Sequence, residues 1–156
     1  MKKTGFTLVE LLVSITILGI LASIGLGVFT SAQIKSRDAR RKSNLDQISK
    51  ALEMYFNDYK EYPDSDTGNI SGFTWGTSSF QDTKGTVYMV KLPKDPVSGY
   101  TYYYAAIPTA GINTKFQLYA HLENTQDPSI ITPSGSPNCG TGKPCNYGVS
   151  SSNTTP

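Results

Sequence analysis

Residues 1–29 of the chain read MKKTGFTLVELLVSITILGILASIGLGVF. Two lysines precede Gly5, and the 24 residues from Phe6 to Phe29 then carry a single charge, that of Glu10. An apolar stretch of this length can span a bilayer as a helix, whereas a carboxylate in its first turns is unfavourable unless it has a task. The stretch therefore predicts a membrane-spanning helix with a functional acid near its start.

Two simpler interpretations of this segment compete. A secretory signal peptide has a similar basic start, but its apolar region is shorter, and Ser23-Ile24-Gly25 is a poor cleavage site. An ordinary membrane anchor has the right length, yet it leaves Glu10 and the Gly5–Phe6 junction unexplained.

The short basic leader is followed by a motif that resembles the N-terminus of type IV pilins and the related pseudopilins, namely Gly5, Phe6, Thr7, Leu8, Val9 and Glu10. The resemblance implies that a membrane-embedded prepilin peptidase cuts between Gly5 and Phe6 and that the new amine of Phe6 is methylated. It also implies that the chain is a filament subunit and not an enzyme.

Glu10 is then the residue with the clearest chemical role. Cleavage exposes a cationic amine on Phe6 at a helix N-terminus, where the helix dipole disfavours it. Glu10 lies four residues further on, about 6 Å along the helix axis. It cannot easily reach its own amine, but it could neutralise that of a neighbouring subunit, so we expect Glu10 to act in assembly.

The helix is expected to continue well beyond the membrane. No glycine or proline occurs between Val28 and Tyr62, so nothing there interrupts a helix from Phe6 to Tyr59. Helical spacing places six later apolar residues on one face: Leu45, Ile48, Leu52, Tyr55, Phe56 and Tyr59. In the apolar half, glycines permit close helix approach, and we hypothesise a bend or local melting at Gly25–Gly27.

These features divide the chain into four parts: a leader (1–5), a transmembrane and polymerisation half of the helix (6–29), an amphipathic half (30–60) and a head (61–156). Segments 86–92, 100–107 and 115–123 are strand-like. In the last, four apolar residues alternate with Gln117, Tyr119, His121 and Glu123; they are Phe116, Leu118, Ala120 and Leu122. We therefore predict an α+β fold in which the long helix packs on a small antiparallel sheet. A further strand at 147–151 is left open.

A basic cluster follows the apolar run and comprises Lys35, Arg37, Arg40, Arg41 and Lys42, with Asp38 among them. Basic flanks favour the cytoplasmic side of a membrane, but the resemblance requires the leader to face a cytoplasmic peptidase. We interpret the cluster as a solvated helix face or as an attraction to lipid headgroups and acidic neighbours. DNA capture is a secondary interpretation, because loss of the two leader lysines leaves 14 − 2 = 12 basic residues against 12 acidic ones.

The segment Leu92-Pro-Lys-Asp-Pro96 also resembles the head of the major pseudopilin of type II secretion. The chain departs from that pattern after Glu123, because the acidic, glycine-rich tail that binds calcium in those proteins is not apparent. Asp95 and Asp127 alone supply too few oxygen ligands for calcium. We predict no metal or other cofactor.

The two cysteines of the chain, Cys139 and Cys145, lie near its C-terminus. We predict a disulfide between them, which requires an oxidising compartment; the alternative is a pair of metal ligands, for which no further cysteine or histidine lies nearby. No catalytic constellation appears elsewhere, and His121 is interpreted as a surface residue.

The sequence thus predicts a structural subunit of a type IV pilus-like filament. The alternatives are a pseudopilin of a type II secretion system, or a minor pilin that binds DNA or surfaces. The expected partners are further copies in a helical filament, the prepilin peptidase and methyltransferase, an assembly platform and the membrane. The precursor is expected to cross the cytoplasmic membrane once with its head outside, and later to join an extracellular pilus or an envelope pseudopilus.

Overall fold

The computed structural model describes residues 5–156, apart from the side chains of residues 24–26. Lys2 and Lys3 of the leader lie outside the described residues. The bend hypothesised at Gly25–Gly27 overlaps residues 24–26, whose side chains are not described. This bend therefore stays a prediction. The chain divides into two compact units, Met1–Ser36 and Arg37–Pro156.

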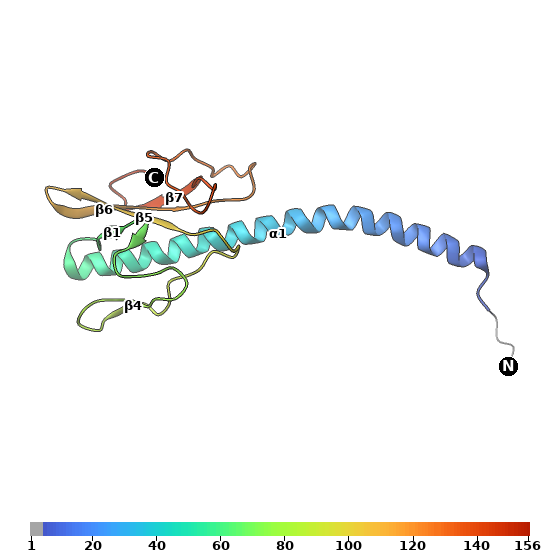
Figure 1. Ribbon diagram of the computed structural model, residues 1–156, viewed down its shortest axis with the longest axis horizontal. Coiled ribbons are helices and arrows are strands. Elements are labelled where there is room, and N and C mark those ends of the chain that lie inside the picture. The colour runs from blue at the N-terminus through green and yellow to red at the C-terminus, as the bar shows by residue number, and fades with distance from the viewer. Residues whose placement is uncertain (1–4) are drawn as a thin grey trace. The chain divides into compact units, whose positions relative to one another are not determined.

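A single helix, α1, spans Leu8–Tyr59 and contributes to both units (Figure 1). Its bounds agree with the predicted helix apart from the first two residues. It ends where Lys60 adopts a φ of 61° and donates its N–H to the carbonyl of Phe56. A residue in this left-handed conformation commonly closes a helix, because its N–H then satisfies a carbonyl of the last turn.

The predicted apolar face of α1 is confirmed in the second unit. Leu45, Ile48 and Leu52 are fully buried, and three aromatic residues beyond them are half-buried against the same core, namely Tyr55, Phe56 and Tyr59. Their 3.6-residue spacing puts them on the side of α1 that faces the strands. The head core is therefore organised around this part of α1.

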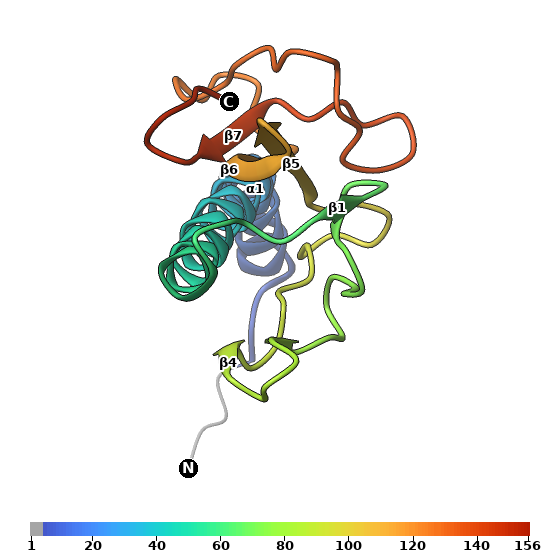
Figure 2. The ribbon, with the colours of Figure 1, turned by 90° about the vertical axis from the view of Figure 1, so that its left-hand side faces the viewer.

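The main sheet is antiparallel, with the order β5-β6-β7, and its strands are Tyr103–Thr109, Ile112–Ala120 and Tyr147–Ser150. It covers one side of the C-terminal part of α1, while β4 lies on another side (Figures 1 and 2). The β5–β6 hairpin turns at Ala110 and Gly111, whose φ angles of 53° and 85° are those a two-residue hairpin needs. The sequence did not decide whether residues 147–151 form a strand. Tyr147–Ser150 do so as β7, which pairs with β6.

Two small hairpins complete the second unit. β1 (Ser65–Asp66) pairs with β2 (Asn69–Ile70), and β3 (Phe80–Gln81) pairs with β4 (Val87–Met89). They lie in and after the long polar connection that follows the helix. Its isolated aromatic residues anchor it, since Phe80 is buried and Phe73 and Trp75 pack against the core.

The strands differ in extent from the predictions. The segment 86–92 is a strand only at β4, because Leu92 leaves the ladder and donates its N–H to Ser78 in a neighbouring turn. β5 starts at Tyr103 and not at residue 100, since Thr101 bonds to the carbonyl of Cys139.

The alternation predicted for the third strand segment is largely confirmed, since its four inward residues are all fully buried: Phe116, Leu118, Ala120 and Leu122. The strand itself, β6, spans Ile112–Ala120 and not 115–123. Tyr119 is an exception to the pattern, because it is buried on the opposite face beneath Cys139 and Cys145.

Leu52→Ala should lower the free energy of unfolding by about 2–5 kcal/mol, because it leaves a cavity between α1 and the sheet. Met54→Ala, two residues on but 48% exposed, is the matched control and should cost no more than about 0.5 kcal/mol. Urea unfolding of the full-length chain in detergent, followed by fluorescence of the single tryptophan, Trp75, measures both. Equal effects of the two substitutions would contradict the assigned core.

Candidate functional site

Thr7 and Glu10 form a capping box at the N-terminus of α1. Oε2 of Glu10 accepts hydrogen bonds from the Thr7 backbone N–H at 2.9 Å and from the Thr7 hydroxyl at 2.6 Å. In return, Thr7 Oγ1 accepts a hydrogen bond from the Glu10 N–H at 3.3 Å. Such reciprocal bonds satisfy N–H groups that the first turn of a helix leaves free. Its Thr-x-x-Glu signature before an apolar run is visible in the sequence, although the motif was not among the predictions above.

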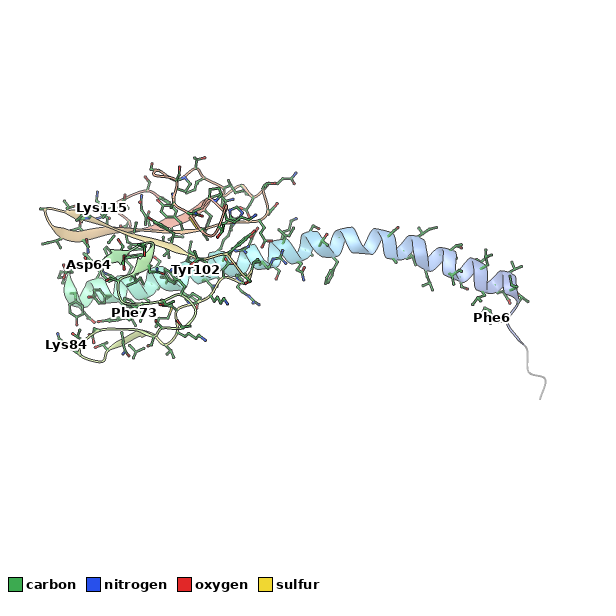
Figure 3. The ribbon with its side chains drawn as sticks, in the orientation of Figure 1. Phe6, Asp64, Phe73, Lys84, Tyr102 and Lys115 are labelled. Carbon is green, nitrogen blue, oxygen red and sulfur yellow. A yellow bond between two sulfur atoms is a disulfide. The ribbon has the colours of Figure 1, made fainter. Side chains whose placement is uncertain are left out.

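Gly5 and Phe6, the predicted cleavage site, immediately precede this cap. Figure 3 shows Phe6 at this end of α1. Phe6 is 77% exposed. A Cβ added to Gly5 would meet no atom within 4 Å. The junction is therefore sterically open to another protein. Cleavage at Gly5, methylation of Phe6 and the assembly role of Glu10 stay predictions.

The first half of α1 exposes almost all of its apolar side chains. Leucines, valines and isoleucines from Leu8 to Phe29 are about half or more exposed where their side chains are described. Among the described residues, α1 is the one helix long and apolar enough to cross a membrane. A surface of this kind requires lipid or other apolar helices as its surroundings.

The basic stretch that follows contains a fully buried charge, Arg41. Its Nε and Nη2 donate to the two carboxylate oxygens of Asp95 at 2.7 and 2.8 Å. Its Nη1 donates to Asp38 and to Glu123, each at 2.7 Å. The guanidinium of α1 thus joins the loop after β4 to the chain that leaves β6.

The surrounding groups complete what we call the Arg41 cluster: Arg37, Asp38, Arg41, Asp95 and Glu123. Arg37 binds both oxygens of Glu123 at 2.8 and 2.7 Å. Asp38 also accepts the backbone N–H groups of Glu123 and Asn124, at 3.0 and 2.8 Å. Each buried carboxylate therefore has several donors, the condition under which burying charge is tolerated.

The cluster favours the charged forms of Arg41 and Glu123. Burial acts against the charge of Arg41, but hydrogen bonds to Asp95 and Glu123 outweigh it and raise the Arg41 pKa. Hydrogen bonds from Arg37, and then from Arg41, lower the pKa of Glu123 to about 2 although burial opposes the change. The ion pair between Arg41 and Glu123 therefore persists throughout the neutral range.

The interpretation of the basic cluster as a solvated face is wrong for three of its five residues, whereas the other interpretation, an attraction to acidic neighbours, agrees with their ion pairs. Arg37 and Arg41 belong to the cluster, and Lys42 donates to both oxygens of Asp127 at 2.8 and 2.9 Å and to Ser129 at 3.1 Å. Lys35 and Arg40 alone of the five are exposed. Most of the partner acids lie more than fifty residues later in the chain, beyond any local pattern.

The two carboxylates considered for calcium are occupied by cations of the chain itself. Asp95 binds Arg41, and Asp127 binds Lys42. Within residues 5–156, no group of three or more His, Cys, Asp or Glu side chains could hold a metal ion.

Cys139 and Cys145 form a disulfide with their Cα atoms 5.0 Å apart, as predicted. The ring of Tyr100 links the disulfide loop to α1, because it lies 5.1 Å from the guanidinium of Arg41 and 5.5 Å from the ammonium of Lys143. Gly140 bridges to Tyr100, and a Cβ there would collide with the carbonyl oxygen of Gly99. The loop is therefore held close to the joint between α1 and the sheet.

His121 is more than the surface residue that was expected. It is half-buried, its ring packs edge-on against Tyr100 at 5.3 Å, and its Nδ1 lies 2.7 Å from the carbonyl oxygen of Pro144. It therefore supports the disulfide loop.

Comparison with known families agrees with these features. The prokaryotic N-terminal methylation motif matches residues 1–26, and type II secretion system protein G matches residues 28–127. The chain belongs to the type II secretion system protein G family. It is thus a member of the pilin and pseudopilin superfamily, and its α+β architecture is that of a pilin-like protein.

The relatives of this family member include both pseudopilins and a pilin. Type II secretion system core protein G of Vibrio cholerae is 34% identical over 96 residues, which cover 61% of this chain and 66% of the relative. The core protein G of Pseudomonas aeruginosa is 32% identical over 129 residues, or 76% and 82% of the two chains. Type IV major pilin protein PilA of Myxococcus xanthus is 36% identical over 72 residues, covering 46% of this chain and 32% of the pilin. No solved structure matches the chain significantly.

Arg41→Ala should lower the free energy of unfolding of this protein G family member by about 3–5 kcal/mol, because it leaves Asp38 and Asp95 buried without their cation. Arg40→Ala, at the neighbouring exposed position, should change it by no more than about 0.5 kcal/mol. Urea unfolding in detergent measures both. A small effect at Arg41 would show that water replaces the guanidinium at little cost.

The stability of the head should fall as the solution is acidified. A carboxylate whose pKa is depressed in the folded state stabilises the fold above its unfolded pKa and loses that contribution as the pH falls to the folded value. For Glu123 this window runs from about 4.5 down to about 2. Glu123→Gln should flatten the decline of the unfolding free energy between about pH 5 and 2, measured by urea titrations at each pH. An unchanged slope would assign the acid sensitivity to other carboxylates.

Proposed function

We propose that the chain is a structural subunit of a type IV pilus-like filament that assembles through the first half of α1. The capped, exposed and apolar start of this helix supports the proposal above all. Such a surface is stable in a bilayer, and in a filament sister helices can replace the lipid.

The precursor is processed before it assembles. A membrane-embedded prepilin peptidase cuts between Gly5 and Phe6, and the amine of Phe6 is methylated. The match of the methylation motif to residues 1–26 supports both steps. The head crosses to the outer side of the cytoplasmic membrane, and the need of the Cys139–Cys145 disulfide for an oxidising compartment supports that orientation.

Glu10 then sets the register between subunits. Its Oε2 is engaged by Thr7, whereas its Oε1 accepts no hydrogen bond within the described part of the chain. This second oxygen is available to the amine of a neighbour's Phe6. An apolar surrounding makes an unpaired charge cost several kcal/mol, so the pair favours one axial offset over others.

A pseudopilin of a type II secretion system is the second candidate function. The family match over residues 28–127, which includes the Leu92–Pro96 segment, favours it. The chain beyond residue 127 lies outside that match and carries the disulfide loop.

Isolation of filaments from the cell surface distinguishes the two candidates. We expect long extracellular fibres whose main component is this chain and begins with methylated Phe6 on N-terminal sequencing. Filaments confined to the envelope, together with loss of protein secretion on deletion, would support the pseudopilin. An uncut chain that starts at Met1 would refute the processing.

Glu10→Gln should abolish most filament formation while the precursor is still inserted and cut. The amide can still accept the bonds from Thr7, so this variant removes the charge and spares the cap. Ser14→Ala, which removes only a hydroxyl bonded to the Glu10 carbonyl, is the matched control and should assemble normally. Filament yield relative to processed subunit, measured by immunoblot, is the readout; normal filaments from Glu10→Gln would refute the role of the charge.

A further inference from the structure

A cavity of about 280 Å³ opens where α1 ends, beside the β3–β4 hairpin. Aromatic rings line it: Tyr55 stacks on Tyr59 with centroids 4.6 Å apart and on Phe80 at 5.6 Å, and Phe73 meets Phe80 edge-on at 5.4 Å. Asp64 and Phe73, both lining residues, lie near this end of α1 (Figure 3). We call this cavity the aromatic pocket.

Two carboxylates, those of Asp64 and Asp82, line the aromatic pocket. Asp82 accepts hydrogen bonds from the Tyr59 hydroxyl at 2.9 Å and from two backbone N–H groups, and these bonds lower its pKa to about 2 against the effect of burial. Asp64 lines the pocket and Glu61 is nearby; both are exposed, and neither forms an ion pair within the described residues.

One ring of the pocket, that of Tyr59, already has a cation of the same chain, Lys84, beside it, although this lysine does not line the pocket. The ammonium of Lys84 lies 5.3 Å from the centre of the Tyr59 ring. Aromatic faces flanked by carboxylates attract cations electrostatically, and the planar guanidinium of arginine suits them well because it can stack and form hydrogen bonds at once. The chemistry of the pocket therefore fits an arginine side chain.

The same unit carries such a side chain at its other end. Arg40 is exposed and, unlike Arg37 and Arg41, pairs with no acid within the described residues. It precedes Tyr59 on α1 by 19 residues, which is about 28 Å along the helix axis. Arg40 therefore cannot reach the pocket of its own chain.

We propose that the aromatic pocket of one copy receives Arg40 of a second copy, displaced along the helix axis. The proposal rests on the filament function proposed above and identifies a head contact within it. Pocket and arginine lie on different surfaces of the same unit, so the contact is heterologous and each copy can both donate and receive. Repeated, such a contact produces an open filament and not a closed dimer.

Charge exchange in the full-length chain tests the contact. Arg40→Asp and Asp64→Arg should each reduce filament yield about tenfold, and the two together should restore it to within about threefold, because the exchanged pair can still attract. Lys50→Asp is the matched control, since Lys50 is an exposed cation on the same helix whose one ion pair within the described residues is with Asp46. It should leave the yield within about twofold of the wild type.

Cysteine cross-linking provides a second test that does not require altered charges to be tolerated. Arg40→Cys combined with Asp64→Cys should give a ladder of linked subunits on denaturing gels after filaments are treated with a thiol-reactive cross-linker long enough to replace the arginine side chain, because a direct disulfide needs closer Cα atoms. Each single cysteine variant should give no ladder, because the native cysteines are paired with each other.

The outcomes separate this contact from the filament function. If the wild type forms no filaments, the proposed function fails. If the wild type forms filaments but the charge variants assemble normally, or the exchanged pair is not rescued and no ladder forms, the pocket is not a subunit contact. Wild-type assembly in every variant would also be the result if the pocket binds some other partner, and it would overturn the proposal.

Discussion

A buried guanidinium determines how the head is built. Arg41 lies in the middle of a proline-free helix and binds carboxylates from three parts of the chain, including Asp95 and Glu123. Few arrangements of these segments leave all three acids satisfied, and each alternative would leave a charge buried without a partner. The ion cluster therefore specifies the position of the sheet on the helix more strictly than apolar packing alone.

The Arg41 cluster and the apolar core make different contributions to the packing of α1 against the sheet. The face from Leu45 to Tyr59 supplies buried area, which is favourable over a range of small displacements. The hydrogen bonds of the Arg41 guanidinium, by contrast, are directional, and they fix the register between helix and strands. The disulfide loop joins the same region through Tyr100, so its position depends on the ion cluster as well as on the bond between Cys139 and Cys145.

Local pattern predicted the helix and the inward face of β6 because both have a period that neighbouring residues reveal. It also drew attention to Glu10, since a lone charge in an apolar run stands out. It failed for Arg41 and Lys42, because a basic side chain on a helix looks the same in sequence whether it is solvated or paired with a distant acid. Tyr119 was missed for a similar reason: the segment that covers it is rich in proline, serine and glycine and has no periodicity.

The segment after residue 127 lies outside the family match and covers the sheet face opposite α1 (Figure 2). Only β7, through Tyr147 and Val149, reaches the main core from it. The remainder is joined to the rest of the head by polar contacts, among them the hydrogen bonds from the Thr101 N–H to the Cys139 carbonyl, from the Gln117 amide to the Thr155 carbonyl and from Lys42 to Ser129. This outer layer can therefore diversify between relatives, provided that β7 keeps its register, while α1 stays unchanged. Such a separation would let one assembly apparatus display many different surfaces.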